Sequence, residues 1–255
     1  MIVLREKVIS EFQKYTSQYD LSNPKILLKV NHTYRVAQFC EEIAKSLSLN
    51  KEDIDLAWLC GMLHDIGRFE QVKRFGTFFD SQSVDHAQFG ADLLFLEGLS
   101  DRFMEKKERE ADLLEKAIRV HNQYRLPKDL SEREERFAHI LRDADKIDIL
   151  RVNYETPFEE VYNVPMEELL NSEVSGEVKE AFMEGRCAKR NSRTTAIDYL
   201  VGHICLSFEL IFPKSRELLL EQGYVYKLLE FESNNANTRQ WFAYMREHFE
   251  EKMNG

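Results

Sequence analysis

Six residues of this chain have side chains that bind transition metals and occupy positions expected to face the core. The six are His32, His64, Asp65, His86, His121 and Asp145. Imidazole nitrogen and carboxylate oxygen suit divalent iron, manganese, cobalt, nickel or zinc, and magnesium also accepts carboxylate oxygen. None of the six is a cysteine, which weakens a structural zinc site. The pattern therefore predicts one or two divalent metal ions.

Helical spacing directs the first of these side chains inward. Ser22 or Asn23 followed by Pro24 is typical of a helix start, since serine and asparagine cap helices and proline fits the first position. The apolar positions that follow include Val36 and Ile43, and one turn before Val36 comes His32. His32 is therefore expected on the buried face of this helix.

The adjacent pair His64 and Asp65 follows an apolar helix that Asn50 is expected to cap. We expect this helix to run into the pair and to end at Gly67, because glycine commonly terminates helices. Both side chains would then lie at the negative end of the helix dipole, where a cation is favoured.

Three later helices are expected to carry the remaining residues. One begins at His86, and another places His121 on its apolar face. A third opens with the capping box Ser131-Glu-Arg-Glu134 and has Asp145 on its inner face. A carboxylate on a core face requires a partner, because burying an unpaired charge is costly.

Six ligands are too many for one tetrahedral ion but suit two ions that share a carboxylate and leave positions for water. Asp65 is the natural shared ligand, since it lies between the two flanking sets. The predicted sets are His32, His64, Asp65 and Asp145 for one ion, and Asp65, His86 and His121 for the other.

Composition indicates an all-α protein. The chain has 255 residues with only 10 glycines and 5 prolines, and its long segments are rich in helix-forming residues. The formal net charge of -10 argues against general nucleic-acid binding, which usually needs a basic surface. A local basic patch for one phosphorylated metabolite is compatible with this charge.

The four cysteines, Cys40, Cys60, Cys187 and Cys205, lie far apart and are expected to be buried free thiols. The N-terminus lacks an apolar signal core, and no apolar run reaches the ~18 residues of a membrane span. We therefore expect a cytoplasmic protein that does not enter a membrane. The sequence leaves its oligomeric state open.

The ordered motifs resemble the HD-domain superfamily of metal-dependent phosphohydrolases. The resemblance rests on His32 in His-Thr-Tyr-Arg-Val-Ala, on the doublet His64-Asp65 in Leu-His-Asp-Ile-Gly-Arg, and on Asp145 in Asp-Ala-Asp-Lys-Ile-Asp. His86 and His121 fall where the binuclear branches of that superfamily carry two further ligands. The resemblance covers roughly residues 22 to 155.

This resemblance implies hydrolysis of a phosphoester of a small nucleotide or phosphorylated metabolite by a metal-activated water. His64 and Asp65 are then catalytic as well as metal-binding. Arg68 comes three residues after Asp65 and Lys146 directly after Asp145, and both are expected to offset charge on the phosphate. A surface ion pair with Asp143 or Asp148 is the alternative role of Lys146.

The predicted organisation has three parts. Residues 1–21 form a packing helix, residues 22–155 form the HD domain, and residues 156–255 form a helical extension packed on the HD core. Within the domain, residues 68–84 lack a sustained period and are expected to be a loop beside the site.

Two other functions are compatible with the residues. Some superfamily members with the same six ligands resemble di-iron oxygenases that act on small organic substrates. A non-catalytic sensor module is the third interpretation, and the intact ligand set argues against it, because buried acids and histidines without metal reduce stability.

Overall fold

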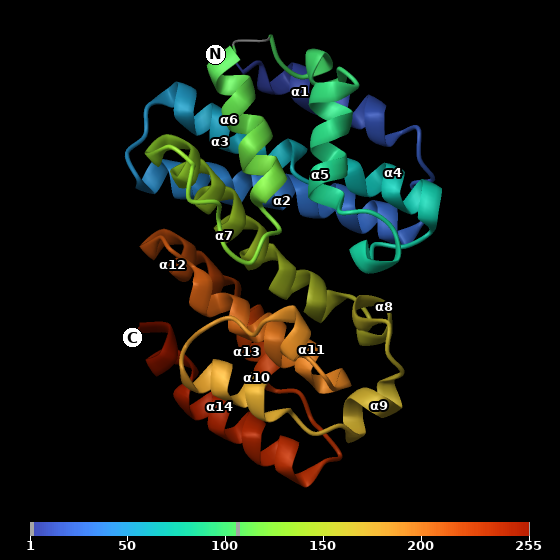
Figure 1. Cartoon of the computed structure of the whole chain (residues 1–255), viewed down its shortest axis with the longest axis vertical. Coiled ribbons are helices and arrows are strands. Elements are labelled where there is room, and N and C mark those ends of the chain that lie inside the picture. The colour runs from blue at the N-terminus through green and yellow to red at the C-terminus, as the bar shows by residue number, and fades with distance from the viewer. Residues whose placement is uncertain (1–2, 106–107, 255) are drawn as a thin grey trace. The chain divides into compact units, whose positions relative to one another are not determined.

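The structure is a computed structural model that describes residues 3–105 and 108–254 (Figure 1). Over these residues the regular structure is entirely helical, which confirms the predicted all-α fold. The chain divides into two compact units, Met1–Asp145 and Lys146–Gly255. None of the helices in the described part combines the length and the apolar composition that a membrane span requires.

The first unit contains six helices, three short helical turns and the start of a seventh helix. The helices are α1 (Arg5–Thr16), α2 (Pro24–Ser46), α3 (Lys51–Leu63), α4 (Ile66–Phe75), α5 (His86–Ala91), α6 (Glu108–Val120) and α7 (Glu132–Glu155), and the turns are η1 (Asp80–Gln82), η2 (Asp92–Leu96) and η3 (Leu99–Arg102). The predicted packing helix of residues 1–21 corresponds to α1, and residues 1–2 lie outside the described residues.

The expected helix starts are confirmed. The Asn23 side chain accepts a hydrogen bond from the backbone N–H of Lys25, with Pro24 at the first helical position of α2. The Asn50 side chain accepts from the backbone N–H of Asp53 at the start of α3. These caps fix where each helix begins, and hence which residues share a buried face.

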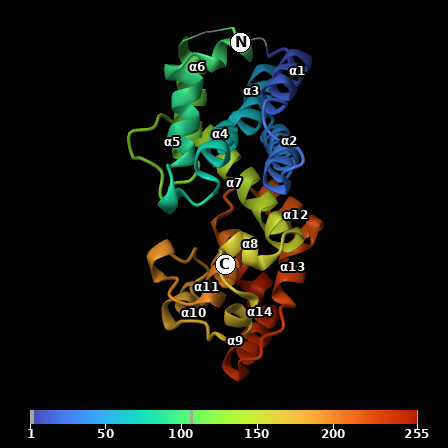
Figure 2. The same ribbon diagram turned by 90° about the vertical axis from the view of Figure 1, so that its right-hand side faces the viewer.

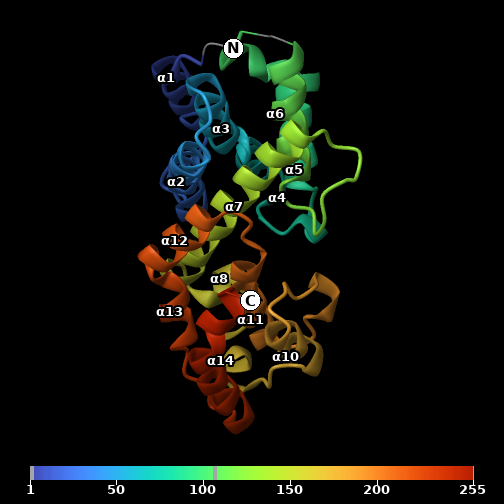
Figure 3. The ribbon, with the colours of Figure 1, turned by 90° about the vertical axis from the view of Figure 1, so that its left-hand side faces the viewer.

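Helices α2 and α3 pack closely side by side (Figure 3). Gly61 makes this approach possible, because a Cβ atom there would lie only 2.5 Å from Cα of Ala37. Both helices bury aliphatic side chains at the contact, including Ile43 and Leu59, which are fully buried. The histidines His32 and His64 are carried by this pair of helices.

The prediction that the helix carrying His64 continues to Gly67 is wrong. Helix α3 ends at Leu63, the backbone turns at Asp65, and a new helix, α4, already begins at Ile66. Gly67 instead allows close packing of α4 on α5, because a Cβ there would lie 2.7 Å from the backbone nitrogen of Gly90. Figure 2 shows these two helices side by side.

The expectation of a loop over residues 68–84 is also wrong for its first half. Helix α4 extends to Phe75 and ends at Gly76, whose φ of 69° is the left-handed conformation that glycine favours. Phe69 and Val72 of this helix are buried. The irregular part is limited to the segment around the short turn η1.

The second unit contains the end of α7 and the remaining helices. These are α8 (Phe158–Tyr162), α9 (Met166–Asn171), α10 (Gly176–Met183), α11 (Ala196–Ile204), α12 (Pro213–Gln222), α13 (Tyr224–Leu229) and α14 (Ala236–Asn254), with short turns η4 (Arg190–Ser192) and η5 (Cys205–Glu209). Within this unit α11 contacts α9, α10 and α13. All four cysteines of the chain are buried free thiols, as predicted.

Candidate metal centre

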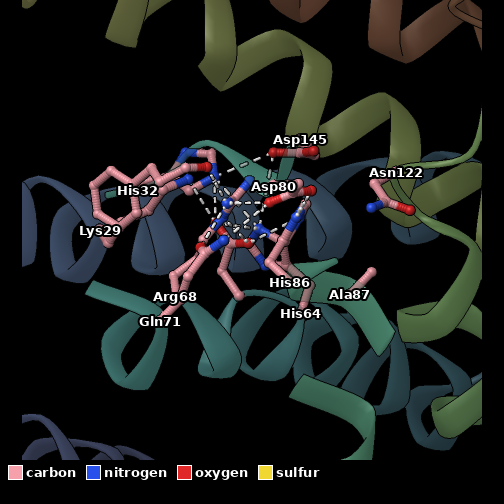
Figure 4. A network of polar contacts seen from close by, with 12 residues as sticks. Lys29, His32, His64, Arg68, Gln71, Asp80, His86, Ala87, Asn122 and Asp145 are labelled. Atoms are coloured by element: carbon pink, nitrogen blue, oxygen red, sulfur yellow. Dashed lines mark hydrogen bonds and ion pairs between the residues drawn. The ribbon is translucent and has the colours of Figure 1, made fainter. Parts of the chain in front are cut away.

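The six residues selected from the sequence come from separate helices and lie together in the first unit. Their positions are His32 in α2, His64 at the end of α3, Asp65 between α3 and α4, His86 at the start of α5, His121 directly after α6 and Asp145 in α7. Figure 4 shows several of these side chains converging on one network of polar contacts. All except Asp145 are at most 5% exposed, and the Asp145 side chain is 16% exposed.

Backbone contacts orient two of the histidines. Nδ1 of His64 donates a hydrogen bond to the carbonyl oxygen of Gly61 at 2.8 Å, and Nδ1 of His121 donates to that of Ile118 at 2.7 Å. A carbonyl oxygen can only accept, so each Nδ1 carries the proton. In the neutral ring Nε2 then keeps its lone pair, which points into the cluster.

The lone pairs on Nε2 of His86 and Nε2 of His121 face each other. Nδ1 of His86 donates to Oδ2 of Asp80 at 2.7 Å, and Nε2 of His86 lies 3.1 Å from Nε2 of His121. Two acceptors at this distance repel each other unless a cation lies between them. Burial, together with the neighbouring histidines, lowers the pKa of His121 to about 3, which disfavours a proton in that place at neutral pH.

The spacing of the ring nitrogens fits a metal ion. Two nitrogens that bind one ion at about 2.1 Å lie about 3.0 Å apart at a right angle and about 3.4 Å apart in a tetrahedron. The pair His86 and His121 is separated by 3.1 Å, and Nε2 of His32 and Nε2 of His64 are separated by 3.3 Å. Each pair could therefore bind an ion with little rearrangement.

Asp65 lies between the two histidine pairs. Its Oδ2 is 3.5 Å from Nε2 of His32 and 3.4 Å from Nε2 of His64, while its Oδ1 is 3.6 Å from Nε2 of His86. The structure thus forms two potential metal-binding groups that share Asp65, one with His32 and His64 and the other with His86 and His121. One carboxylate with its two oxygens directed to different histidine pairs has the arrangement of a bridging ligand.

Asp145 approaches the cluster from α7. Its Oδ1 lies 3.1 Å from Nε2 of His32 and 3.8 Å from Nε2 of His64. It also belongs to a potential metal-binding group with His64 and His121. Burial alone would raise the pKa of Asp145, but the hydrogen bond from His32 and the positive charge nearby hold it well below its usual range. Asp145 is therefore an anion at neutral pH, as a metal ligand would have to be.

A lysine that the sequence interpretation missed compensates the charge of Asp65. Nζ of Lys29 lies 2.7 Å from Oδ2 of Asp65, and the Lys29 side chain is only 15% exposed. Burial alone would raise the pKa of Asp65, but the Lys29 ammonium and the other cationic groups hold it well below its usual range. Lys29 precedes His32 by three residues in α2, so the spacing of residues on one helix face was the available signal.

Arg68 is held beside Asp65 by a second acid. Nη1 of Arg68 donates to Oδ1 of Asp80 at 2.8 Å and to the Phe78 carbonyl oxygen at 2.7 Å. Its Nε makes no hydrogen bond and lies 3.6 Å from Oδ1 of Asp65. Arg68 therefore lies where the sequence predicted a cation, next to the potential metal ligands.

Asp80 connects Arg68 to His86, since its Oδ1 accepts from Arg68 and its Oδ2 accepts from His86. Burial would raise the pKa of Asp80, but the hydrogen bond with His86 and the charge of Arg68 lower it strongly. Gln71, which is fully buried, also donates to Asp80 at 3.1 Å. Sequence reasoning missed Asp80, because it lies in the segment around η1 that has no periodicity.

Lys146 is the first residue of the second unit and contacts another residue of that unit. Its Nζ donates to the carbonyl oxygen of Glu209 at 3.4 Å. Adjacent residues on a helix point about 100° apart, so Lys146 does not share the direction of Asp145. Its predicted catalytic role stays a prediction.

Comparison with known proteins identifies the segment that carries this cluster. Residues 30–150 match the family model described as the HD domain. No curated protein and no solved structure matches the chain. The matched segment includes all six clustered residues, and its helical structure is that expected of the family. The similarity to the HD domain therefore spans the segment that carries the cluster.

Proposed function

We propose that this chain is a metal-dependent phosphohydrolase that hydrolyses a phosphoester of a small nucleotide or phosphorylated metabolite. The observation that carries the proposal is the facing pair of acceptor nitrogens, Nε2 of His86 and Nε2 of His121, 3.1 Å apart in a buried site. HD domains are generally found in metal-dependent hydrolases, which favours hydrolysis as the reaction.

The proposed centre is binuclear. His32, His64 and Asp145 would hold one ion, His86 and His121 the other, and Asp65 both. A pair of bound divalent ions supplies Lewis acidity and lowers the pKa of a coordinated water toward neutrality. Asp80 and the carbonyl oxygens of Gly61 and Ile118 keep three imidazole rings in the tautomer that presents Nε2 to the ions.

Lys29 and Arg68 are the proposed phosphate-binding residues. Both lie beside Asp65, and each has its charged group 5.7 Å from the centroid of the Phe78 ring. Positive charge next to the ions would attract the phosphoryl oxygens and orient the ester for attack. The Nε of Arg68 makes no hydrogen bond and lies 3.6 Å from Oδ1 of Asp65, so the positive charge of Arg68 is beside the proposed bridging carboxylate.

The test is metal analysis of the purified chain followed by a screen of nucleotides and simple phosphoesters for released phosphate. We expect bound transition metal and phosphate release, and an Asp65→Asn variant should lose about 1,000-fold or more of the activity because both ion sites lose a ligand. Asp129→Asn is the matched control, since Asp129 is exposed. His64→Ala should behave like Asp65→Asn.

Three outcomes would contradict the proposal. The first is equal activity of Asp65→Asn, His64→Ala and the wild type. The second is a product that requires both iron and dioxygen and is absent with manganese, which would indicate an oxygenase. The third is a chain that binds metal in none of its preparations and releases no phosphate, which would indicate a non-catalytic module.

A further inference from the structure

A buried arginine of α7 binds the main chain that carries His121. Arg142 is only 6% exposed, and its guanidinium donates hydrogen bonds to the segment that follows α6. Its Nη1 lies 3.3 Å from the carbonyl oxygen of Val120 and 3.4 Å from that of His121. Nη1 also donates to the carbonyl oxygen of Gln123, and Nη2 lies 3.5 Å from that of Tyr124. One side chain therefore contacts four carbonyl groups at and beside this proposed ligand.

The end of α6 is a place where such a partner is needed. The last carbonyl groups of a helix have no partner within the helix, and together they form the negative end of its dipole. A guanidinium stays protonated and presents several N–H donors in one plane, so a single arginine can bind several of these oxygens. The conformation of the chain directly after α6 therefore depends on Arg142.

The ring of His121 is fixed to this main chain. The backbone nitrogen of His121 donates to the carbonyl oxygen of Ile118 at 3.4 Å, and Nδ1 of the same residue donates to the same oxygen at 2.7 Å. The ring therefore moves together with its backbone. Because the distances between a metal ion and its ligands vary by only about 0.2 Å, a shift of this backbone would separate Nε2 of His121 from an ion that Nε2 of His86 also binds.

A second contact joins the residues next to the two histidines. Oδ1 of Asp85 accepts a hydrogen bond from Nδ2 of Asn122 at 3.0 Å. Asp85 directly precedes His86, and Asn122 directly follows His121. The same Asp85 oxygen accepts from two backbone N–H groups in the first turn of α5, which it caps. The start of α5 is therefore tied to the segment after α6, close to the two facing Nε2 atoms.

Arg142 shares a face of α7 with Asp145, since residues three apart in a helix lie on the same side. Oδ1 of Asp145 lies 3.1 Å from Nε2 of His32, in the first group of potential ligands. Arg142, in contrast, contacts the main chain of His121, in the second group. Helix α7 therefore contributes to both proposed ion sites, directly to one and through the main chain to the other.

We propose that Arg142 is a positioning residue for the second ion, the one assigned to His86 and His121. Arg142 acts on the main chain of His121, and it sets the distance between the two Nε2 atoms before metal binds. The contact between Asp85 and Asn122 supports the same distance. This inference rests on the binuclear centre of the proposed function, but it does not depend on the reaction or on the substrate.

The experiment is equilibrium dialysis of the metal-free full chain against manganese, followed by metal analysis. We expect two ions per chain in the wild type, and His86→Ala identifies the affinity that remains when only the first ion binds. Arg142→Met should weaken the second ion about 10- to 100-fold, as expected when a group that orients a metal ligand is lost, and should leave the affinity for the first ion nearly unchanged. Arg136→Met is the matched control, because Arg136 lies in the same helix with its side chain 41% exposed, and it should bind both ions like the wild type.

Two further variants distinguish positioning from a general loss of stability. Arg142→Lys keeps a buried donor with a positive charge, so it should recover part of the affinity for the second ion that Arg142→Met loses. Asn122→Ala removes a contact at the surface, so it should fold normally and weaken the second ion about 10-fold. Urea denaturation of each metal-free variant measures its stability separately.

The proposal is overturned if the wild type binds fewer than two ions, or if Arg142→Met binds the second ion as tightly as the wild type. It is also overturned if Arg142→Met weakens both ions equally. Should Arg142→Met not fold, wild-type affinity for the second ion in both Arg142→Lys and Asn122→Ala overturns it. Two bound ions and the expected selective loss, in a chain that releases no phosphate, would contradict the proposed hydrolase and support the positioning role.

Discussion

In the first unit acids lie against the buried histidines, whereas in the second unit the charges that act on His203 are those of two arginines. In the first unit, Asp65 and Asp145 face His32 and His64 at 3.1 to 3.8 Å. In the second unit, His203 forms a hydrogen bond with the neutral amide of Asn153, and burial followed by the charges of Arg193 and Arg190 lowers its pKa. The side-chain types overlap, but the sign of the surrounding charge is opposite.

We therefore expect the charge around a histidine, more than its burial, to indicate whether a cation can bind beside it. An acid-rich group of acceptor nitrogens favours a cation, whereas neighbouring arginines disfavour one. The pKa of His121 and that of His203 both fall to about 3, so these values alone do not distinguish the two sites.

Among the substitutions that distinguish the two units, the replacement of Asp80 should have the largest effect, which is a loss of metal affinity in the first unit. Asp80→Ala removes the acceptor that holds the proton of His86 on Nδ1, and comparable losses reduce metal affinity about 10- to 100-fold. Metal titration with a fluorescent competitor measures this loss, with Asp129→Ala as the control. Unaltered metal affinity would show that this acid does not support the centre.

A backbone substitution tests whether helix packing positions His86. Gly67→Ala would place Cβ 2.8 Å from the carbonyl oxygen of His86 and 2.7 Å from the Gly90 nitrogen, so we expect a loss of about 2 kcal/mol in unfolding free energy and weaker metal binding. In Gly76→Ala no heavy atom would lie within 4 Å of the new Cβ. Only the positive φ of residue 76 disfavours a side chain there. The Gly76→Ala control should therefore lose about 1 kcal/mol of unfolding free energy and bind metal as well as the wild type.

Urea denaturation and metal titration of both glycine variants measure these differences. If Gly67→Ala and Gly76→Ala lose the same stability and both retain full metal affinity, the contact of α4 with α5 does not position the ligand.

The smallest expected effect concerns the pH dependence contributed by His203. Its pKa is about 3 in the folded chain and near 6.5 when unfolded, so the unfolded state takes up the proton first as the pH falls. The stabilisation from neutral His203 is complete above about pH 6.5 and is lost progressively toward pH 3. At pH 5 the loss is about 1–2 kcal/mol.

His203→Gln should reduce the difference in unfolding free energy between pH 8 and pH 5 by that amount, measured by urea denaturation with a chelator present. His248→Gln, which changes a histidine elsewhere in the same unit, is the control. An unchanged pH difference in His203→Gln would mean that His203 does not experience the positive charge described here.

Much of the first unit follows from local sequence signals. The caps at Asn23 and Asn50 and the inward phase of His32 depend on residues within one or two turns, so periodicity is sufficient to predict them. The same holds for the helical fold class. These features require no knowledge of which helices pack together.

The features that sequence reasoning missed depend on contacts between distant segments. Gly67 was interpreted as a helix end, but its role is the approach to Gly90, which no local pattern encodes. Lys29 and Asp80 acquire their roles only when α2 and the segment around η1 meet the site. The carbonyl oxygens that Arg142 binds lie in a different segment of the chain, so no local pattern shows this contact.

The packing of α2 on α3 has a consequence for how the chain can fold while it is being translated. This helix pair is continuous in the sequence and closes through the contact of Gly61 with Ala37, and it already carries His32, His64 and Asp65. A nascent chain grows from its N-terminus, so half of the donor atoms emerge from the ribosome long before residues 86 to 145. One half of the centre can therefore assemble on a short helical hairpin while the ribosome is still translating the other half.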